Sequence, residues 1–201
     1  MRVNKEFENR PNRIIEEHPL PMHRTARTKE ILHNNPTIHA ERSDADHVVI
    51  TVYDYNAETV DEHRFDSVDQ SFGFRNNNRV TWINVDGLRK NDIESICRHY
   101  NIHNLIIEDI LSINQRPKMD EIENVVYCLL NMLYFNEEKK SIETEQISIV
   151  LGPDFVLSFQ EDANRDVFDP IRSKLKMARS NVRQRGADYL CYSMIDLIVD
   201  N

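Results

Sequence analysis

Glycine is scarce in this sequence, and no glycine-rich loop is present. The four glycines, Gly73, Gly87, Gly152 and Gly186, are spread singly over the chain. Loops that hold phosphate groups need closely spaced glycines, because the backbone amides must approach the ligand. The sequence therefore argues against a nucleotide-binding enzyme of the common kinds.

Long apolar runs and metal-type cysteine pairs are also missing. The longest apolar run, 125–130, is far short of the roughly 20 residues that a membrane helix needs. The N-terminus lacks the apolar core of a signal peptide. Cys97, Cys128 and Cys191 lie far apart, without CxxC spacing, and each falls within an apolar periodic segment. We interpret them as buried apolar side chains in a reducing compartment.

Positive charge is in deficit. The chain has 25 Lys and Arg residues against 34 Asp and Glu residues, which gives a net charge of -9. General nucleic-acid binders and proteins that bind anionic membranes rely on clustered positive charge. We therefore expect cations or basic surfaces as partners, and no nucleic acid.

The length and composition predict one sizeable domain with appendages. The 201 residues are 40% hydrophobic and 29% charged, enough for a real core. Residues 1–45 are polar, with prolines and arginines interspersed and no clear periodicity, so we predict a weakly ordered N-terminal arm. We place the domain at 46–185 and a last helix at 186–201. That helix is still periodic at Asn201, so we expect the sequence to be part of a longer protein.

Apolar patterning predicts a sheet. Strands are expected at 47–56, 59–66, 80–85, 123–135, 142–151 and 155–160. A turn near Asn56 joins the first two strands, and the turn at 152–154 joins the last two, so each of these pairs is expected to be antiparallel. Segment 123–135 is nearly continuously apolar, as in a strand covered on both faces.

Helical spacing predicts helices between and after these strands. They are expected at 66–72, 90–100, 103–111, 169–184 and from 187 onward. Asp169 can cap the fourth helix, with Pro170 in its first turn. Together the elements predict an α/β (α+β) fold, in which a mixed, largely antiparallel central sheet is sandwiched between helices (α/β/α).

The segment 103–118 places two acidic residues on a short apolar helix. Glu108 and Asp109 lie away from its apolar face, and Pro117 forces a turn shortly after the helix. Such a pair is usually a solvated polar face; the alternative is a site for a hard divalent cation, which prefers oxygen ligands. Neighbours on a helix point about 100° apart, so a partner carboxylate from elsewhere, such as another subunit, would be required.

The last helix offers further carboxylates. Asp196 and Asp200 are one turn apart on a polar stripe and point the same way. We treat Asp196 as a candidate metal ligand and Asp200 as a possible extension of that stripe.

Several segments together resemble one protein family. They are WINVDG (82–87), HNLIIEDIL with NQRPK (103–118), ETEQISIVL with VLSFQE (143–161), DVFDPIR (166–172) and RGADYLCYSMIDLIVDN (185–201). In this order they are similar to the cytosolic domain of CorA-type magnesium transport proteins. The resemblance covers residues 45–201, and the first 45 residues fall outside it.

The resemblance implies a role in ion transport rather than catalysis. Family members are homopentameric divalent-cation channels with a cytosolic domain, a long stalk helix and two membrane helices. Their Gly-Met-Asn pore signature does not occur in this chain. The resemblance thus implies a regulatory domain without enzymatic activity, on the cytoplasmic side of the cell membrane, with 186–201 starting the stalk helix. It also implies Mg2+ as regulatory and transported ion, with Co2+ and other divalent cations possible.

The same resemblance assigns residues and a mechanism. The regulatory ion would lie between subunits, with Asp109 as ligand, Glu108 beside it and Asp196 on the last helix. Bound ions would hold the pentamer closed, and their loss would let like charges repel. Alternatives are a zinc or other divalent-cation transporter, a soluble enzyme using Glu108, Asp109 and Asp196 on a metal, and a module whose acidic helix binds a basic partner.

Overall fold

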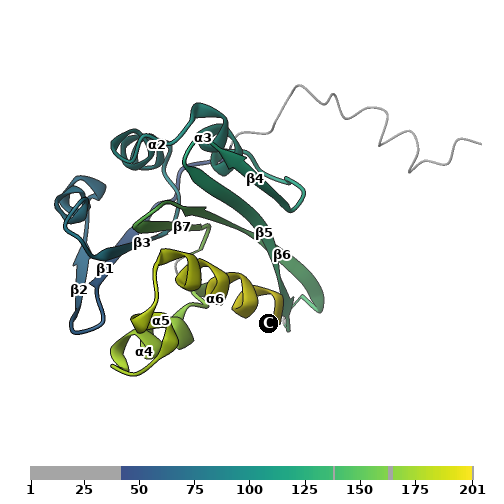
Figure 1. Ribbon diagram of the computed structural model, residues 1–201. Helices are drawn as coiled ribbons and strands as arrows, with labels where there is room; N and C mark the ends of the chain where they lie inside the picture. Colours follow the sequence, from purple (N-terminus) through teal and green to yellow (C-terminus); the bar gives the residue numbers. More distant parts are fainter. Residues whose placement is uncertain (1–41, 138, 163–164, 201) are drawn as a thin grey trace, which may run out of the picture. The chain divides into compact units, whose positions relative to one another are not determined.

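A seven-stranded sheet forms the centre of the fold in the computed structural model, which describes residues 42–137, 139–162 and 165–200 (Figure 1). Its strands are β1 (Val49–Tyr55), β2 (Val60–Phe65), β3 (Val80–Asp86), β4 (Lys118–Ile122), β5 (Val125–Asn136), β6 (Ser141–Leu151) and β7 (Phe155–Gln160). They lie in the order β2-β1-β3-β7-β6-β5-β4. Every neighbouring pair is antiparallel except β3 and β7, which are parallel. The prediction of a mixed, largely antiparallel sheet is therefore confirmed.

Helices cover both faces of this sheet, as Figure 1 shows. On one face lie the 3-10 helix η1 (Val68–Phe74), α2 (Lys90–His99) and α3 (Asn104–Leu111). On the other lie α4 (Asp169–Lys176), α5 (Asn181–Gln184) and α6 (Ala187–Asp200). The α/β/α arrangement agrees with the prediction. Within the described part of the chain, no helix has the length and apolarity needed to cross a membrane.

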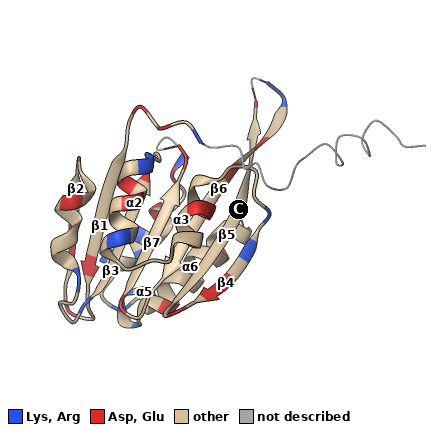
Figure 2. Ribbon diagram, turned by 90° about the horizontal axis from the view of Figure 1, so that it is seen from above, with Lys and Arg blue, Asp and Glu red and all other residues tan. Residues whose placement is uncertain are grey.

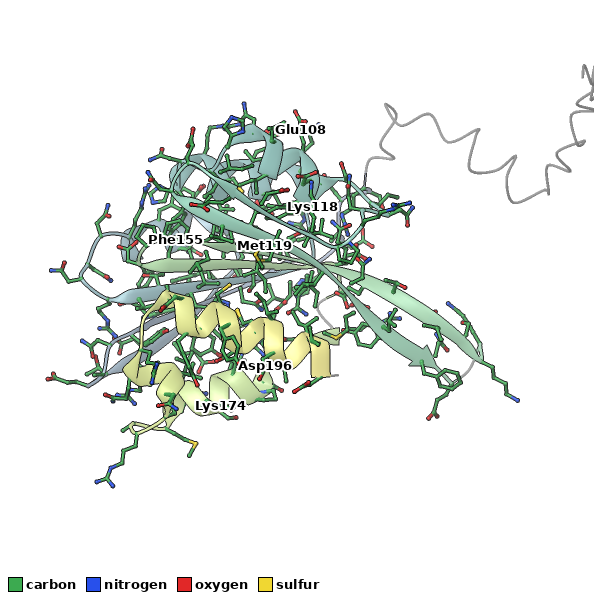
Figure 3. All side chains as sticks on the ribbon, turned by 45° about the vertical axis from the view of Figure 1, so that its right-hand side comes forward. Glu108, Lys118, Met119, Phe155, Lys174 and Asp196 are labelled. Carbon is green, nitrogen blue, oxygen red and sulfur yellow. The ribbon has the colours of Figure 1, made fainter. Side chains whose placement is uncertain are left out.

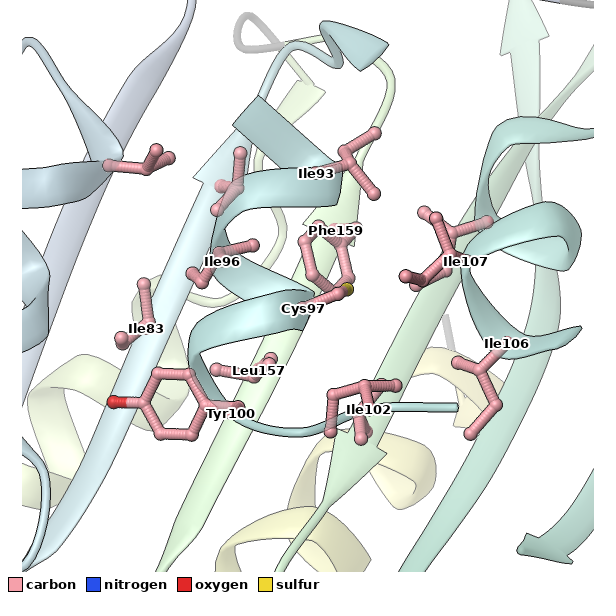
Figure 4. Close-up of a cluster of buried hydrophobic side chains, with 14 of the residues drawn as sticks. Ile83, Ile93, Ile96, Cys97, Tyr100, Ile102, Ile106, Ile107, Leu157 and Phe159 are labelled. Carbon is pink, nitrogen blue, oxygen red and sulfur yellow. The ribbon is translucent and has the colours of Figure 1, made fainter. Parts of the chain in front are cut away.

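The first core fills the space between the sheet and the pair α2 and α3 (Figure 4). Ile106 and Ile110 of α3 are fully buried and four residues apart, the spacing that brings side chains to one helix face. They pack with buried residues of α2, β3 and β7 that include Ile93, Ile96, Cys97, Ile83, Leu157 and Phe159. Each buried side chain of this size stabilises the fold by about 1.5–3 kcal/mol. This packing fixes the orientation of α3.

The second core lies between the sheet and α4 to α6. Trp82 of β3 is fully buried in it, stacked on Tyr53 at 5.0 Å and meeting Phe168 edge-on at 5.7 Å between ring centroids. Cys128 of β5 and Cys191 of α6 belong to this core, and Cys97 to the first. All three cysteines are free and buried, which confirms their interpretation as apolar side chains.

The predicted helix 169–184 was wrong in its length. The chain leaves α4 at Met177, where the backbone is extended, and enters α5 after Ser180. The Ser180 hydroxyl donates to the Lys174 carbonyl and accepts from the Arg183 amide, so it both closes α4 and caps α5. Asp169 is the first residue of α4 rather than its cap, which is Phe168.

Strand β4 was not predicted, and β5 was predicted correctly only in part. The residues of β4 alternate between partly buried and exposed, so no buried apolar face marks the segment. In β5, Leu129 is fully buried, but Leu133 and Phe135 are 62% and 66% exposed. The far end of β5 is therefore not covered on both faces. The predicted arm, up to residue 41, lies outside the described residues.

Candidate cation-binding site

Helix α3 carries the acidic pair on its outer side. The His103 ring accepts a hydrogen bond from the Leu105 amide at the start of the helix. At the other end, the Ser112 amide and hydroxyl both donate to the Glu108 carbonyl. Because Ile106 and Ile110 face the sheet, Glu108 is exposed and Asp109 is only partly buried. The helical pattern predicted this placement correctly.

Asp109 has a partner that the sequence did not suggest. The Lys118 ammonium lies 2.5 Å from Asp109 Oδ2 and 3.7 Å from Asp120 Oδ2. Lys118 is the first residue of β4, so the turn after α3 brings it back beside the helix. In Figure 2 the ribbon is red at the acidic positions of α3 and carries both blue and red positions along β4. A lysine ammonium thus lies between two carboxylates.

We call Glu108, Asp109, Lys118 and Asp120 the α3 cluster, and the backbone beneath it is hydrogen-bonded to the sheet. Gln146 of β6 donates its amide to the carbonyls of Asp109 and Ser112, at 3.4 and 3.1 Å. These bonds hold the end of α3 over β6. The carboxylate of Asp109 therefore starts from a fixed main-chain position.

The ion pair itself is weak enough to be exchanged. The side chains of Lys118 and Asp109 are 33% and 20% exposed, and ion pairs open to solvent contribute about 0.2–1 kcal/mol. A divalent cation at the ammonium position would carry twice the charge and would prefer the same carboxylate oxygens. The lysine is thus a weakly held counter-ion of Asp109.

Asp196 and Asp200 lie elsewhere in the same chain. Both are exposed on α6, which covers the opposite face of the sheet from α3. Figure 3 shows Glu108 and Lys118 on one side and Asp196 on the other. Tyr192 donates its hydroxyl to Asp196 at 3.5 Å. Among the described residues, no three His, Cys, Asp or Glu side chains form a group that could hold a metal ion. One chain thus brings Glu108 and Asp109 together, but not Asp196.

Comparisons with known proteins give one family. Residues 77–201 match the model of the CorA-like Mg2+ transporter protein family. The chain is 38% identical over 153 residues to the cobalt/magnesium transport protein CorA of Thermotoga maritima, which is 76% of this chain and 43% of that protein. It is 26% identical over 135 residues to the magnesium transporter ALR2 of Saccharomyces cerevisiae, 64% of this chain and 15% of that protein.

Solved structures agree in fold. The soluble domain of CorA from Methanocaldococcus jannaschii matches with a TM-score of 0.54 at 15% identity, over 81% of this chain and 58% of that one. The complete CorA of the same organism matches with a TM-score of 0.54 at 16% identity, over 75% of this chain and 44% of that one. The chain spans less than half of the length of the curated relatives it matches.

Proposed function

Because the chain belongs to the CorA family, we propose that it is the cytosolic, cation-sensing region of a homopentameric magnesium transporter. The observation that carries this proposal is the Asp109 carboxylate, which is held on α3 and, within the described part of the chain, forms its ion pair with a partly exposed lysine. Relatives named for magnesium and cobalt transport support Mg2+ as the main ion, with Co2+ as a second. The region acts as a sensor on the cytoplasmic side of the membrane and performs no catalysis.

Sensing works by exchange at the α3 cluster. When Mg2+ is scarce, Lys118 neutralises Asp109, and the exposed Glu108 repels acidic groups of a neighbouring copy. When Mg2+ is abundant, the ion replaces the lysine ammonium and is shared with carboxylates across the boundary between copies. Mg2+ retains several of its waters, so binding is weak and suits an abundant cation. Binding between copies favours the closed state of the transporter.

The position of Asp196 supports a ring rather than a two-fold dimer. Acidic groups lie on opposite faces of the sheet, Glu108 and Asp109 on α3 and Asp196 on α6. A contact between unlike faces is heterologous, and a heterologous contact closes into a ring when its rotation permits. In such a ring, α3 of one copy would face α6, or the chain that continues from it, of the next. Asp196 and Asp200 then complete a site that one copy leaves open.

The test is the Mg2+ dependence of association. We expect millimolar Mg2+ to increase the sedimentation coefficient of the chain and to slow its digestion by protease, and a chelator to reverse both effects. Asp109→Asn removes the charge without changing the side-chain shape and should shift the response to several-fold higher Mg2+. Glu121→Gln is the matched control, because Glu121 is exposed on β4 and points to the other face of the sheet from Lys118.

Two results would contradict the proposal. One is association that ignores Mg2+, as expected for a module that binds a basic partner. The other is an Asp109→Asn variant that responds like Glu121→Gln. Parallel titrations with Co2+ and Zn2+ separate the magnesium sensor from a zinc sensor, which would respond at far lower Zn2+ than Mg2+.

A further inference from the structure

A chain of buried polar side chains runs along β3 and β7, on the face of the sheet opposite α3. The Trp82 indole donates to the Ser158 hydroxyl at 2.9 Å, and Ser158 donates to Asn84 Oδ1 at 2.6 Å. Asn84 in turn donates its amide to Asp86 Oδ2 at 2.8 Å. None of these side chains is more than 4% exposed. The hydrogen-bonded chain ends at a buried carboxylate.

At this carboxylate several polar atoms lack partners. Among the described residues, Asp86 Oδ1, Glu145 Oε2 and both side-chain polar atoms of Gln160 are buried without a hydrogen-bond partner at ordinary geometry, although the Tyr134 hydroxyl lies close enough to Glu145 to lower the pKa of that carboxyl. Gln160 of β7 is paired in register with Asp86 of β3, and both lie on the face that carries Trp82. Glu145 lies on the same face of the next strand, β6, where its Oε1 accepts from the amides of Glu161 and Asp162.

Such atoms call for an occupant. Burying a polar group without a partner costs about 1–3 kcal/mol, and native structures contain few such groups. Here three oxygen atoms and one amide nitrogen lie on three adjacent strands at one end of the sheet. A cation or ordered water that binds the lone pairs of the three oxygen atoms, together with a water that accepts from the amide nitrogen, removes this cost.

A cavity beside Asp86 provides room. It has a volume of about 290 Å³ and lies on the β1 side of Asp86, where Thr51, Tyr53, Arg64, Asp166 and Arg172 also line it; Gln160 and Glu145 do not line it. The guanidinium of Arg172 is engaged by Asp166 at 2.5 Å and by Asp169 at 2.9 Å, and it lies 5.5 Å from the Trp82 ring centre. Its positive charge is thus shared by two other carboxylates.

The charge balance favours a cation. Burial and, to a smaller extent, the nearby charges of Asp166 and Glu145 raise the pKa of Asp86 to about 7, even though the hydrogen bond from Asn84 and the charge of Arg172 act to lower it. Glu145 also faces this region, and burial raises its pKa. A bound cation would stabilise both carboxylates in their charged form.

We propose that Asp86, Gln160 and Glu145 form a second cation site, inside a single chain, for a hard divalent cation that keeps part of its hydration shell. Two carboxylate oxygens and one amide oxygen are the ligand types that such ions select. The cavity beside Asp86 would hold the retained waters on that side of the ion. This site needs no neighbouring copy and is separate from the α3 cluster.

The sole tryptophan makes the site visible. Trp82 is linked to Asp86 through Ser158 and Asn84, so a charge arriving at Asp86 should change its fluorescence. The titration uses Mg2+ and Ca2+ separately, up to about 10 mM, which is well above the dissociation constants of the weakest usual sites. It is performed in the Asp109→Asn background, so that the α3 cluster does not contribute. We expect a saturable change in emission and a higher melting temperature.

Variants then decide. Asp86→Asn keeps an oxygen for the bond from Asn84 but removes the charge, and should abolish the saturable change. Gln160→Met keeps the carboxylates and the approximate volume, and should weaken apparent affinity several-fold, whereas Glu121→Gln should leave it unchanged. Because protons compete with a cation for carboxylate oxygens, apparent affinity should be lower at pH 6 than at pH 8.

Some results would overturn the proposal. One is an emission and a melting temperature that stay the same with either ion. The unpartnered buried atoms would then be hydrated by water alone. Another is a response that persists in full in Asp86→Asn and in Gln160→Met. If Asp86→Asn does not fold, equal affinities of Gln160→Met and the parent at both pH values overturn it. Failure here leaves the Asp109-dependent association untouched, and the reverse also holds.

Discussion

Replacing Lys118 should make the α3 cluster bind divalent cations more tightly. Lys118→Met removes the ammonium that lies 2.5 Å from Asp109 and 3.7 Å from Asp120. The unbranched methionine keeps most of the stem that approaches the Tyr127 ring, whose centre is 6.0 Å from the ammonium. The carboxylates then lose their internal counter-ion, and an added ion no longer has to displace it.

The size of the effect follows from the strength of the ion pair. Both side chains are partly exposed, at 33% and 20%, so the pair contributes about 0.2–1 kcal/mol. In the parent chain Mg2+ must break this ion pair, and in Lys118→Met it does not. The dissociation constant for Mg2+ should therefore be roughly 1.5- to 5-fold lower in the variant. Lys118→Arg keeps the charge and serves as the matched control, with affinity close to that of the parent chain.

Isothermal titration calorimetry with Mg2+ measures this change, and sedimentation velocity shows whether association moves to lower Mg2+ in parallel. Without added Mg2+, Lys118→Met should associate less than the parent, because Asp109 and Asp120 are then uncompensated. A Lys118→Met variant with unchanged or weaker Mg2+ affinity, while Asp109→Asn still weakens binding, would refute the exchange between lysine and ion.

Two further predictions concern stability. Burial raises the pKa of Asp86 from its ordinary value of 3.8 to about 7 in the folded chain. The parent chain should therefore lose stability as the pH rises from about 4 to about 7, whereas Asp86→Asn should not. With chelator present, urea unfolding at pH 5 and pH 8 should show Asp86→Asn gaining on the parent by a few kcal/mol, to order of magnitude; parallel changes in the two chains would contradict this. Ile106→Ala, at a fully buried position of α3, should cost about 2–5 kcal/mol. Leu105→Ala, at a position that is 55% exposed, should lower the free energy of unfolding by about 0.5 kcal/mol or less. Equal losses of stability in the two variants would contradict the packing of α3.

Local patterning was sufficient for most of the fold. Alternation and helical spacing located the strands from β1 to β3 and from β5 to β7, as well as α2, α3 and α6, close to their observed bounds. Strand β4 escaped because none of its residues is fully buried, so only its pairing with β5 defines it. The break between α4 and α5 depends on the two hydrogen bonds of the Ser180 hydroxyl, and neither glycine nor proline marks it.

The site was predictable only in its local half. Helical periodicity placed Glu108 and Asp109 outward, because that outcome depends on neighbours within one turn. The ion pair with Lys118 depends on where β4 starts, and the meeting of Asp86 with Gln160 depends on the parallel register of β3 and β7. Such register is set by packing of distant segments, which a single sequence does not display.

The one parallel pairing divides the sheet into two antiparallel halves, β2-β1-β3 and β7-β6-β5-β4. Each half consists of strands that follow one another in the chain, and the segment with α2 and α3 connects the first half to the second. The two halves meet only where β3 pairs with β7, and the buried polar side chains from Trp82 to Gln160 lie on this pair of strands. A cation bound there would link the two halves across the β3–β7 pairing, so the concentration of divalent cations would affect how stably the two halves stay joined.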